Sequence, residues 1–250
     1  HIFYEKIQKG WRPQQQLRTE ISALQLDNDE DNDYARWSSV FEVTEDIPLP
    51  QGIGNYNASL MANYYEIYSQ STTASTELGT VAHTNPSLSL GWRMPVASTG
   101  FGRMAVIEPK AQVTHVGGNN RTDDIPNRDA AEYRIDEANL FLAHRYQGKD
   151  YILPGTRVDA GVGVTANDQY LGNVAAFAGI SRRLSGTPSA GLNANQDDIY
   201  SDYVASLSMS PAGFIDIRWS GRMSSHDFTL NESKTVASSS FGAGFLSLTH

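Results

Sequence analysis

Alternation of apolar and polar residues with a period of two runs along most of the chain. Residues 87–94 show it most clearly, because the even positions are Leu, Leu, Trp and Met while the odd positions are Ser, Ser, Gly and Arg. Similar patterns occupy residues 156–164, 203–209 and 215–223. Successive side chains of a β-strand point to opposite faces of its sheet, so the pattern predicts strands with one apolar and one polar face.

Weaker patterns predict about ten to twelve strands in all. The additional strands are expected near residues 14–26, 35–45, 55–68, 103–115, 169–182 and 234–248, with less regular ones at the start of the chain and near 139–152. A short turn at 211–213 contrasts with long polar loops at 27–33, 117–129 and 185–198. Alternating short turns and long loops are typical of membrane barrels, which carry their short turns on the periplasmic side.

The predicted polar faces favour one of two folds that share this alternation. A soluble β-sandwich buries its apolar face, whereas a membrane barrel turns that face to lipid and lines its lumen with polar residues. Here the polar faces are rich in Gly and Ser, and opposite charges share a face, as Arg157 does with Asp159. We therefore predict an all-β, antiparallel transmembrane β-barrel, with residues 1–250 forming part of one outer-membrane β-barrel domain.

Aromatic residues add to this prediction. Trp92, Tyr203 and Trp219 are expected near strand ends, where membrane barrels place aromatic residues at the lipid–water interfaces.

Composition and charge narrow the possible functions. The 250 residues carry a formal net charge of -9, which argues against nucleic-acid binding, and contain no cysteine, which excludes disulfides and thiolate sites. No apolar run is long enough for a transmembrane helix. The chain begins at His1 without a signal-peptide pattern and does not end on an aromatic residue, so we expect an internal piece of a longer exported protein.

A series of short motifs follows in a fixed order from residue 107. Ile-Glu-Pro at 107–109 precedes Asp-Ile-Pro-Asn-Arg-Asp at 124–129, Asp-Glu-Ala-Asn-Leu-Phe at 136–141, Arg-Tyr-Gln-Gly-Lys-Asp at 145–150 and Gly-Thr-Arg at 155–157. This order, with Ser-Asp-Tyr-Val at 201–204, resembles the C-terminal barrel domain of the LPS-assembly family LptD, especially its alphaproteobacterial members. The resemblance covers about residues 101–225. Tyr151 stands where the family leads us to expect Arg, and the cysteines that the family often uses are absent.

The resemblance implies a function in lipopolysaccharide (LPS) transport and assembly, by insertion of LPS into the outer leaflet of the bacterial outer membrane. It implies no enzymatic activity and no cofactor. The implied partners are LPS itself, a plug lipoprotein of the LptE type and the periplasmic proteins of the LPS bridge. Barrels of this family are very large, so we expect the present chain to be an incomplete segment. Two alternatives stay open: a small porin-like passive outer-membrane channel, and a soluble β-sandwich binding module.

Charged residues on the predicted polar faces are candidates for the lumen lining and the LPS path. Their cations can pair with LPS phosphates without holding them too tightly for release. In the alternative interpretation, these residues pair with one another to compensate buried charge. The candidates are Arg93, Glu108, Lys110, Arg157, Asp159, Asp216, Arg218 and Arg222.

Two further segments raise the question of chemistry. His226-Asp227 could belong to a hydrolytic site, but we interpret it as a polar loop dipeptide, and no Gly-x-Ser-x-Gly motif accompanies it. The acidic residues 27–33 could bind Ca²⁺ through carboxylate oxygens, but they lack the Gly and Glu of an EF-hand, and we interpret them as a solvated loop.

Two other segments are expected to be irregular. Pro109 cannot donate to a β-ladder, so it marks an edge, a break or, in our preferred interpretation, a β-bulge. Residues 136–151 alternate poorly and are expected to form an irregular turn capped by Asp136 that enters a strand. This turn either folds over or into the barrel or packs as an ordinary loop.

Overall fold

The computed structural model describes residues 2–26, 33–71, 74–100, 103–118, 135–145, 148–150, 152, 154–168, 172–186, 200–211, 215–241 and 244–249. They form one antiparallel sheet of 13 strands. The strands are β1 (Ile2–Lys9), β2 (Gln15–Leu26), β3 (Asp33–Leu49), β4 (Gly52–Ser71), β5 (Ala74–Arg93), β6 (Val96–Gly100), β7 (Arg103–Val116), β8 (Gly155–Asp168), β9 (Gly172–Ser185), β10 (Tyr203–Met209), β11 (Ile215–Met223), β12 (Leu230–Phe241) and β13 (Gly244–Thr249).

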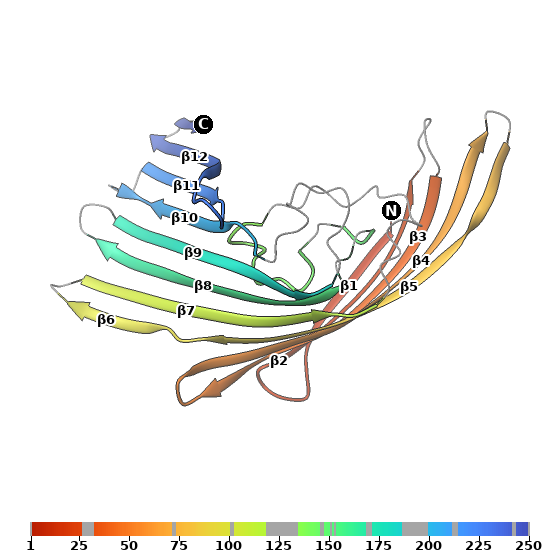
Figure 1. Cartoon of the computed structure of the whole chain (residues 1–250), viewed down its shortest axis with the longest axis horizontal. Helices are drawn as coiled ribbons and strands as arrows, with labels where there is room; N and C mark the ends of the chain where they lie inside the picture. Colours follow the sequence, from red (N-terminus) through yellow and green to blue (C-terminus); the bar gives the residue numbers. More distant parts are fainter. Residues whose placement is uncertain are drawn as a thin grey trace.

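The strands follow one another in the sheet in chain order, and only β6 lies off this path, paired with β7. Figure 1 shows the result as a curved wall with a concave and a convex side. Among the described residues, β1 and β13 each have one neighbour, so the wall does not close on itself. The predicted all-β antiparallel fold, as an incomplete part of a barrel, is confirmed. No described helix is long and apolar enough to cross a membrane.

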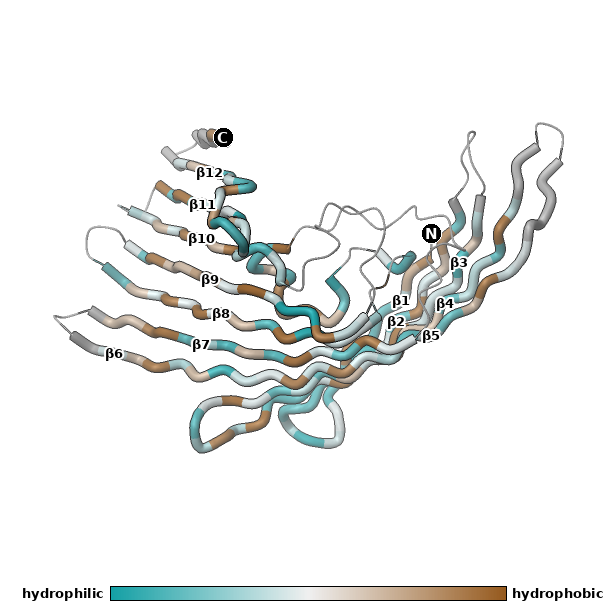
Figure 2. Tube along the Cα trace, in the orientation of Figure 1, coloured by the Kyte–Doolittle hydropathy of each residue, from teal (hydrophilic) through white to brown (hydrophobic). Residues whose placement is uncertain are grey.

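The two faces of the wall have the opposite polarity to those of a soluble sandwich. On β5, Leu88 and Leu90 are 45% and 57% exposed, whereas their neighbours Ser87 and Ser89 are 5% and 3% exposed. Figure 2 shows the same alternation along most strands. Apolar residues of the convex face are exposed: Trp37, Phe41, Leu60, Tyr64, Ile107, Val113, Val162 and Val164. Polar residues of the concave face are buried: Glu20, Ser22, Arg36, Ser38, Asn63, Asn85, Gln112, Thr114, Asp159 and Ser181.

The connections differ in length between the two ends of the strands. At one end, β3 and β4 are joined by residues 50–51, and β8 and β9 by 169–171. At the other end, residues 117–154 separate β7 from β8, and 186–202 separate β9 from β10. The long connections therefore lie at one end, although β4 and β5 are joined at that end by residues 72–73 alone. Most of the predicted loop residues 27–33, 117–129 and 185–198 lie outside the described residues.

Several boundaries differ from the sequence prediction. Residues 139–152 form no strand where they are described, and instead lie on the concave face as turns and bends. The predicted strand 234–248 is two strands, β12 and β13, and the total exceeds ten to twelve because β6 was not expected. Trp92 and Tyr203 lie at strand ends, but Trp219 is in the middle of β11, so its expected place near an end was wrong.

Pro109 does not form the expected β-bulge. It pairs with Val162 of β8 in an unbroken register. On its other side, Arg93 pairs with Lys110 and Val96 with Ile107. Two residues lie between these pairs on each strand, so none is inserted. Met94 still donates to the Pro109 carbonyl at 3.1 Å. Pro109 has no N–H to donate back to Met94, and this missing hydrogen bond separates β5 from β6.

Candidate functional site

A segment between β7 and β8 lies against the concave face of the wall (Figure 1). We call residues 135–154 the strap, of which 135–145, 148–150, 152 and 154 are described. It begins with a turn in which Asp136 Oδ1 accepts from the Asn139 amide at 2.9 Å and Asn139 Oδ1 accepts from the Asp136 amide at 3.0 Å. The predicted cap at Asp136 is therefore present, on a single turn and not on a helix.

The carboxylate of Asp150 is enclosed between the strap and the wall. Its side chain is 0% exposed, and Arg36 of β3 donates to Oδ1 at 2.6 Å. Tyr65 of β4 donates to the same oxygen at 3.0 Å, and the Tyr34 hydroxyl donates to Oδ2. A buried carboxylate is costly unless it is paired and hydrogen-bonded, and these three donors meet that requirement.

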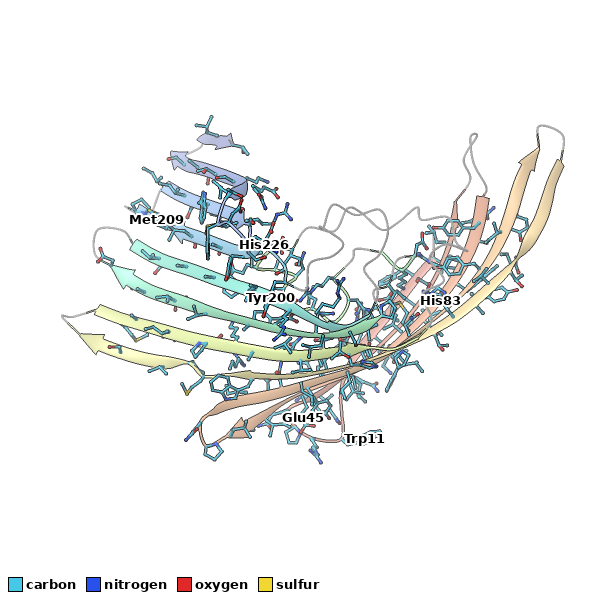
Figure 3. The ribbon with its side chains drawn as sticks, viewed as in Figure 1. Trp11, Glu45, His83, Tyr200, Met209 and His226 are labelled. Atoms are coloured by element: carbon cyan, nitrogen blue, oxygen red, sulfur yellow. The ribbon has the colours of Figure 1, made fainter. Side chains whose placement is uncertain are left out.

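The neighbouring Lys149 attaches the strap to β2 and β4. Its carbonyl accepts from Asn63 Nδ2 at 3.1 Å and from the Tyr65 hydroxyl at 3.3 Å. Its ammonium pairs with Glu20 of β2 and donates to Ser22 at 2.8 Å. His83 of β5 stacks on Tyr65 with ring centroids 5.5 Å apart, and Figure 3 shows it among the side chains of this limb of the wall. Together, Lys149 and Asp150 form the first anchor of the strap.

Arg145 forms the second anchor, on β8 and β9. Its guanidinium pairs with Asp159, whose side chain is 0% exposed, and donates to Ser181 Oγ at 2.9 Å. Arg157 also pairs with Asp159, at 3.2 Å, and donates to the strap carbonyls of Leu142 and Ala143. The predicted pair Arg157–Asp159 therefore holds the strap against the wall.

Apolar side chains of the strap pack at the two ends. Leu140 is fully buried against Phe177 and Val204, and Ile152 packs against Met61 and Val116. Leu140 lies so close to β9 that a Cβ at Gly179 would stand 2.5 Å from its Cδ2. Glycine at 179 thus makes room for Leu140.

The predicted lining residues fall into separate groups on the concave face. Near the short-turn end, Glu108 lies 2.8 Å from Lys110 and 3.9 Å from Arg93, which also pairs with Asp46 at 3.2 Å. The cross-strand partners Arg93 and Lys110 lie directly opposite each other. In these groups, and in Arg157–Asp159, the charges pair with one another, as the alternative interpretation expected.

The other predicted residues lie on β11, beyond the strap. Arg222 pairs with Glu232 of β12 at 3.0 Å, and Asp216 accepts from Ser210 at 2.6 Å. Asp216 and Arg218 are both exposed on the concave face. Their contact with LPS stays a prediction.

The other candidates lie elsewhere. His226 and Asp227 occupy an exposed turn between β11 and β12, at the end opposite Met209 (Figure 3). Asp227 Oδ1 accepts from the Thr229 hydroxyl at 2.8 Å, and hydrogen bonds with Ser224 and Thr229 lower the pKa of Asp227 to about 2. Those hydrogen bonds stabilise the turn itself. Of the acidic loop 27–33, only Asp33 is described, and the described residues contain no His, Cys, Asp and Glu group suited to a metal ion.

Sequence reasoning missed most of the anchoring residues. Arg145, Lys149 and Asp150 stand in one of the quoted motifs, but nothing in that motif indicates Tyr34, Arg36 or Tyr65 as partners. The first two of these lie on β3, more than a hundred residues earlier. The local signal that could have pointed to them is a tyrosine or an arginine at a strand position of the polar face.

Comparison with known proteins gives a family. No curated protein sequence matches the chain. A family model does match, namely LptD, described as LPS transport system D, over residues 4–249. This is nearly the whole chain, and it agrees with the resemblance found in the motifs and with the all-β wall. The chain belongs to the LptD family of the LPS transport system.

Proposed function

We propose that this chain is part of an outer-membrane barrel that inserts LPS into the outer leaflet. The observation that carries the proposal is the reversed polarity of the wall, whose convex face exposes Leu88 and Leu90 while its concave face buries Ser87 and Ser89. An apolar face of this extent suits the hydrocarbon of a bilayer, and a polar one suits a hydrated path. Family membership supplies the cargo, LPS.

The mechanism requires no bond to be made or broken. The anionic headgroup of LPS travels along the polar concave side, and its acyl chains leave sideways into the lipid. A plug lipoprotein of the LptE type and periplasmic bridge proteins are the proposed partners. The strap covers the concave face from β2 to β10, where Leu140 packs against Val204 and Glu137 accepts a hydrogen bond from Ser206. We therefore place the headgroup along β11 and β12, where Arg218 is exposed and Arg222 is half-buried.

Depletion of the full-length protein in its own cell tests the proposal. We expect newly made LPS to disappear from the cell surface, as measured by surface labelling, while the purified protein gives no steady conductance in a planar bilayer. A porin-like channel would give the reverse result, with unchanged surface LPS and open-channel current.

A photo-crosslinking residue then tests the path. Placed at Arg218, it should capture LPS in living cells. Placed at Thr114, which is 0% exposed on the covered part of the same face, it should not. Equal capture at both positions would refute the placement along β11 and β12.

A further inference from the structure

The two anchors of the strap are close in sequence but attach to distant strands. Arg145 holds Asp159 of β8, and Asp150 holds Arg36 of β3. Between β3 and β8 the sheet runs through β4, β5 and β7. The strap therefore crosses the inside of the curve, from one limb of the wall to the other.

Chain length limits how far these limbs can separate. Five residue steps from Arg145 to Asp150 reach at most roughly 18 Å when fully extended. Measured along the wall, the four strand spacings from β3 to β8 amount to about 19 Å. Asp159 is level with Asp46 of β3, through Gln112, Gly91 and Asn55, so Arg36 lies ten residues further along that strand, roughly 33 Å away. On a flattened wall the diagonal between Arg36 and Asp159 would be roughly 38 Å, about twice the reach of the backbone between the anchors. The anchoring side chains would have to cover the difference.

The ion pairs of both anchors are buried, which makes them costly to separate. Arg145 and Arg36 are 5% and 6% exposed in their side chains, and their carboxylate partners are 0% exposed. Releasing the first anchor would take the Asp150 carboxylate away from the buried Arg36, and releasing the second would leave the buried Asp159 with Arg157 alone of its two cations. Loss of an ion-pair partner from a buried charge is strongly unfavourable. The carbonyl contacts of Lys149 and the burial of Leu140 and Ile152 reinforce the same two ends.

We infer that the strap is a tie that sets the curvature of the barrel wall between β3 and β8. While both anchors hold, flattening this part of the wall would stretch the strap and its anchoring side chains towards full extension, so the barrel widens more easily at other strands. Opening of either anchor lets β3 and β8 move apart. The inference concerns the shape of the wall and does not depend on what passes through it.

Distance measurement in the full-length protein, in lipid nanodiscs, tests the tie. Spin labels attached through p-acetylphenylalanine at Asp46 and Thr165 place one probe on β3 and one on β8, both exposed on the concave face. Flattening lengthens a distance measured on the concave side. Pulsed electron resonance should therefore give a longer and broader distance in Asp150→Ala than in the parent protein.

Further variants separate a tie from local damage. Arg145→Met removes the buried ion pair of the opposite end and should lengthen the same distance. A strap anchored at one end only would not give this result. The double variant Tyr34→Phe, Tyr65→Phe removes two hydrogen bonds to Asp150 and keeps both rings. It replaces Asp150→Ala in the experiment if heat-modifiability on gels shows that Asp150→Ala does not fold. Glu232→Gln breaks an ion pair away from the strap and should leave the distance unchanged. An unchanged or shorter distance in the folded anchor variants would overturn the inference.

Discussion

Arg36 Nη1 lies 2.6 Å from Asp150 Oδ1, although the two residues are 114 positions apart in the sequence. Their contact joins an early strand of the wall to a segment that follows β7. Both side chains are buried, so this ion pair compensates two charges that are shielded from water.

Asp150→Ala should destabilise the folded protein by about 3–5 kcal/mol, because Arg36 stays buried without its carboxylate. Urea unfolding in lipid vesicles measures this loss. Replacing both partners, as Arg36→Met with Asp150→Leu, should cost less than Asp150→Ala alone, because no unpaired charge remains. A double variant as unstable as the sum of its single variants would contradict this view of the pair.

Gly179→Ala should destabilise the protein by about 1–3 kcal/mol, because its methyl group would meet Leu140 Cδ2 at 2.5 Å and Ala160 O at 3.0 Å. Gly163→Ala is the matched control on β8, since the nearest atom to its Cβ is Glu108 O at 3.9 Å. Thermal unfolding of both variants is the measurement. Equal midpoints for the two would show that Leu140 does not pack as described.

Protonation of His144 should loosen the strap. Burial lowers the pKa of His144 and the nearby Arg157 lowers it further, while Glu42 acts in the opposite direction. The folded protein therefore binds fewer protons than the unfolded chain below the ordinary pKa of 6.5. Stability from this residue is complete above pH 6.5 and is lost as the pH falls towards the lowered pKa, by at most about 1.4 kcal/mol per pH unit.

The pH dependence can be assigned with His144→Gln. Unfolding midpoints between pH 7.5 and pH 5 should fall less steeply in this variant than in the parent. Parallel curves would mean that other groups cause the decline.

Leu88→Arg tests whether the convex face meets lipid. Leu88 is 45% exposed, so in water an arginine there would cost little, whereas at the middle of a bilayer it costs about 2–4 kcal/mol. Unfolding from vesicles measures the difference. Trp11→Arg, in the turn between β1 and β2 and 90% exposed, is the control and should be nearly neutral. A neutral Leu88→Arg would argue against a lipid-facing wall.

The alternation of side chains was enough to predict an antiparallel sheet and most of its strands, because each strand carries the period-two pattern in its own residues. It could not decide which face is buried, since the same pattern serves a sandwich and a barrel. The exposure of Leu88 beside the burial of Ser89 decides that question in three dimensions.

The strap shows where local patterns fail. Leu140, Phe141 and Ile152 gave residues 139–152 a weak strand-like character, but these side chains pack on the wall and do not form part of it. Sequence motifs marked Arg145 and Asp150 without indicating their partners. Contacts such as Lys149 with Glu20, across 129 positions, depend on how the whole sheet curves, and no local window contains that information.

The long reach of the strap also imposes an order on folding. Its first anchor needs β2, β3 and β4 already side by side, and its second needs β8 and β9, which are synthesised after it. Neither local turn formation nor pairing of neighbouring strands can bury Asp150 alone. Contacts with such separation in sequence form late because a long stretch of chain must first be ordered. Enclosure of Asp150 therefore marks the stage at which this stretch of wall has been assembled in its final register.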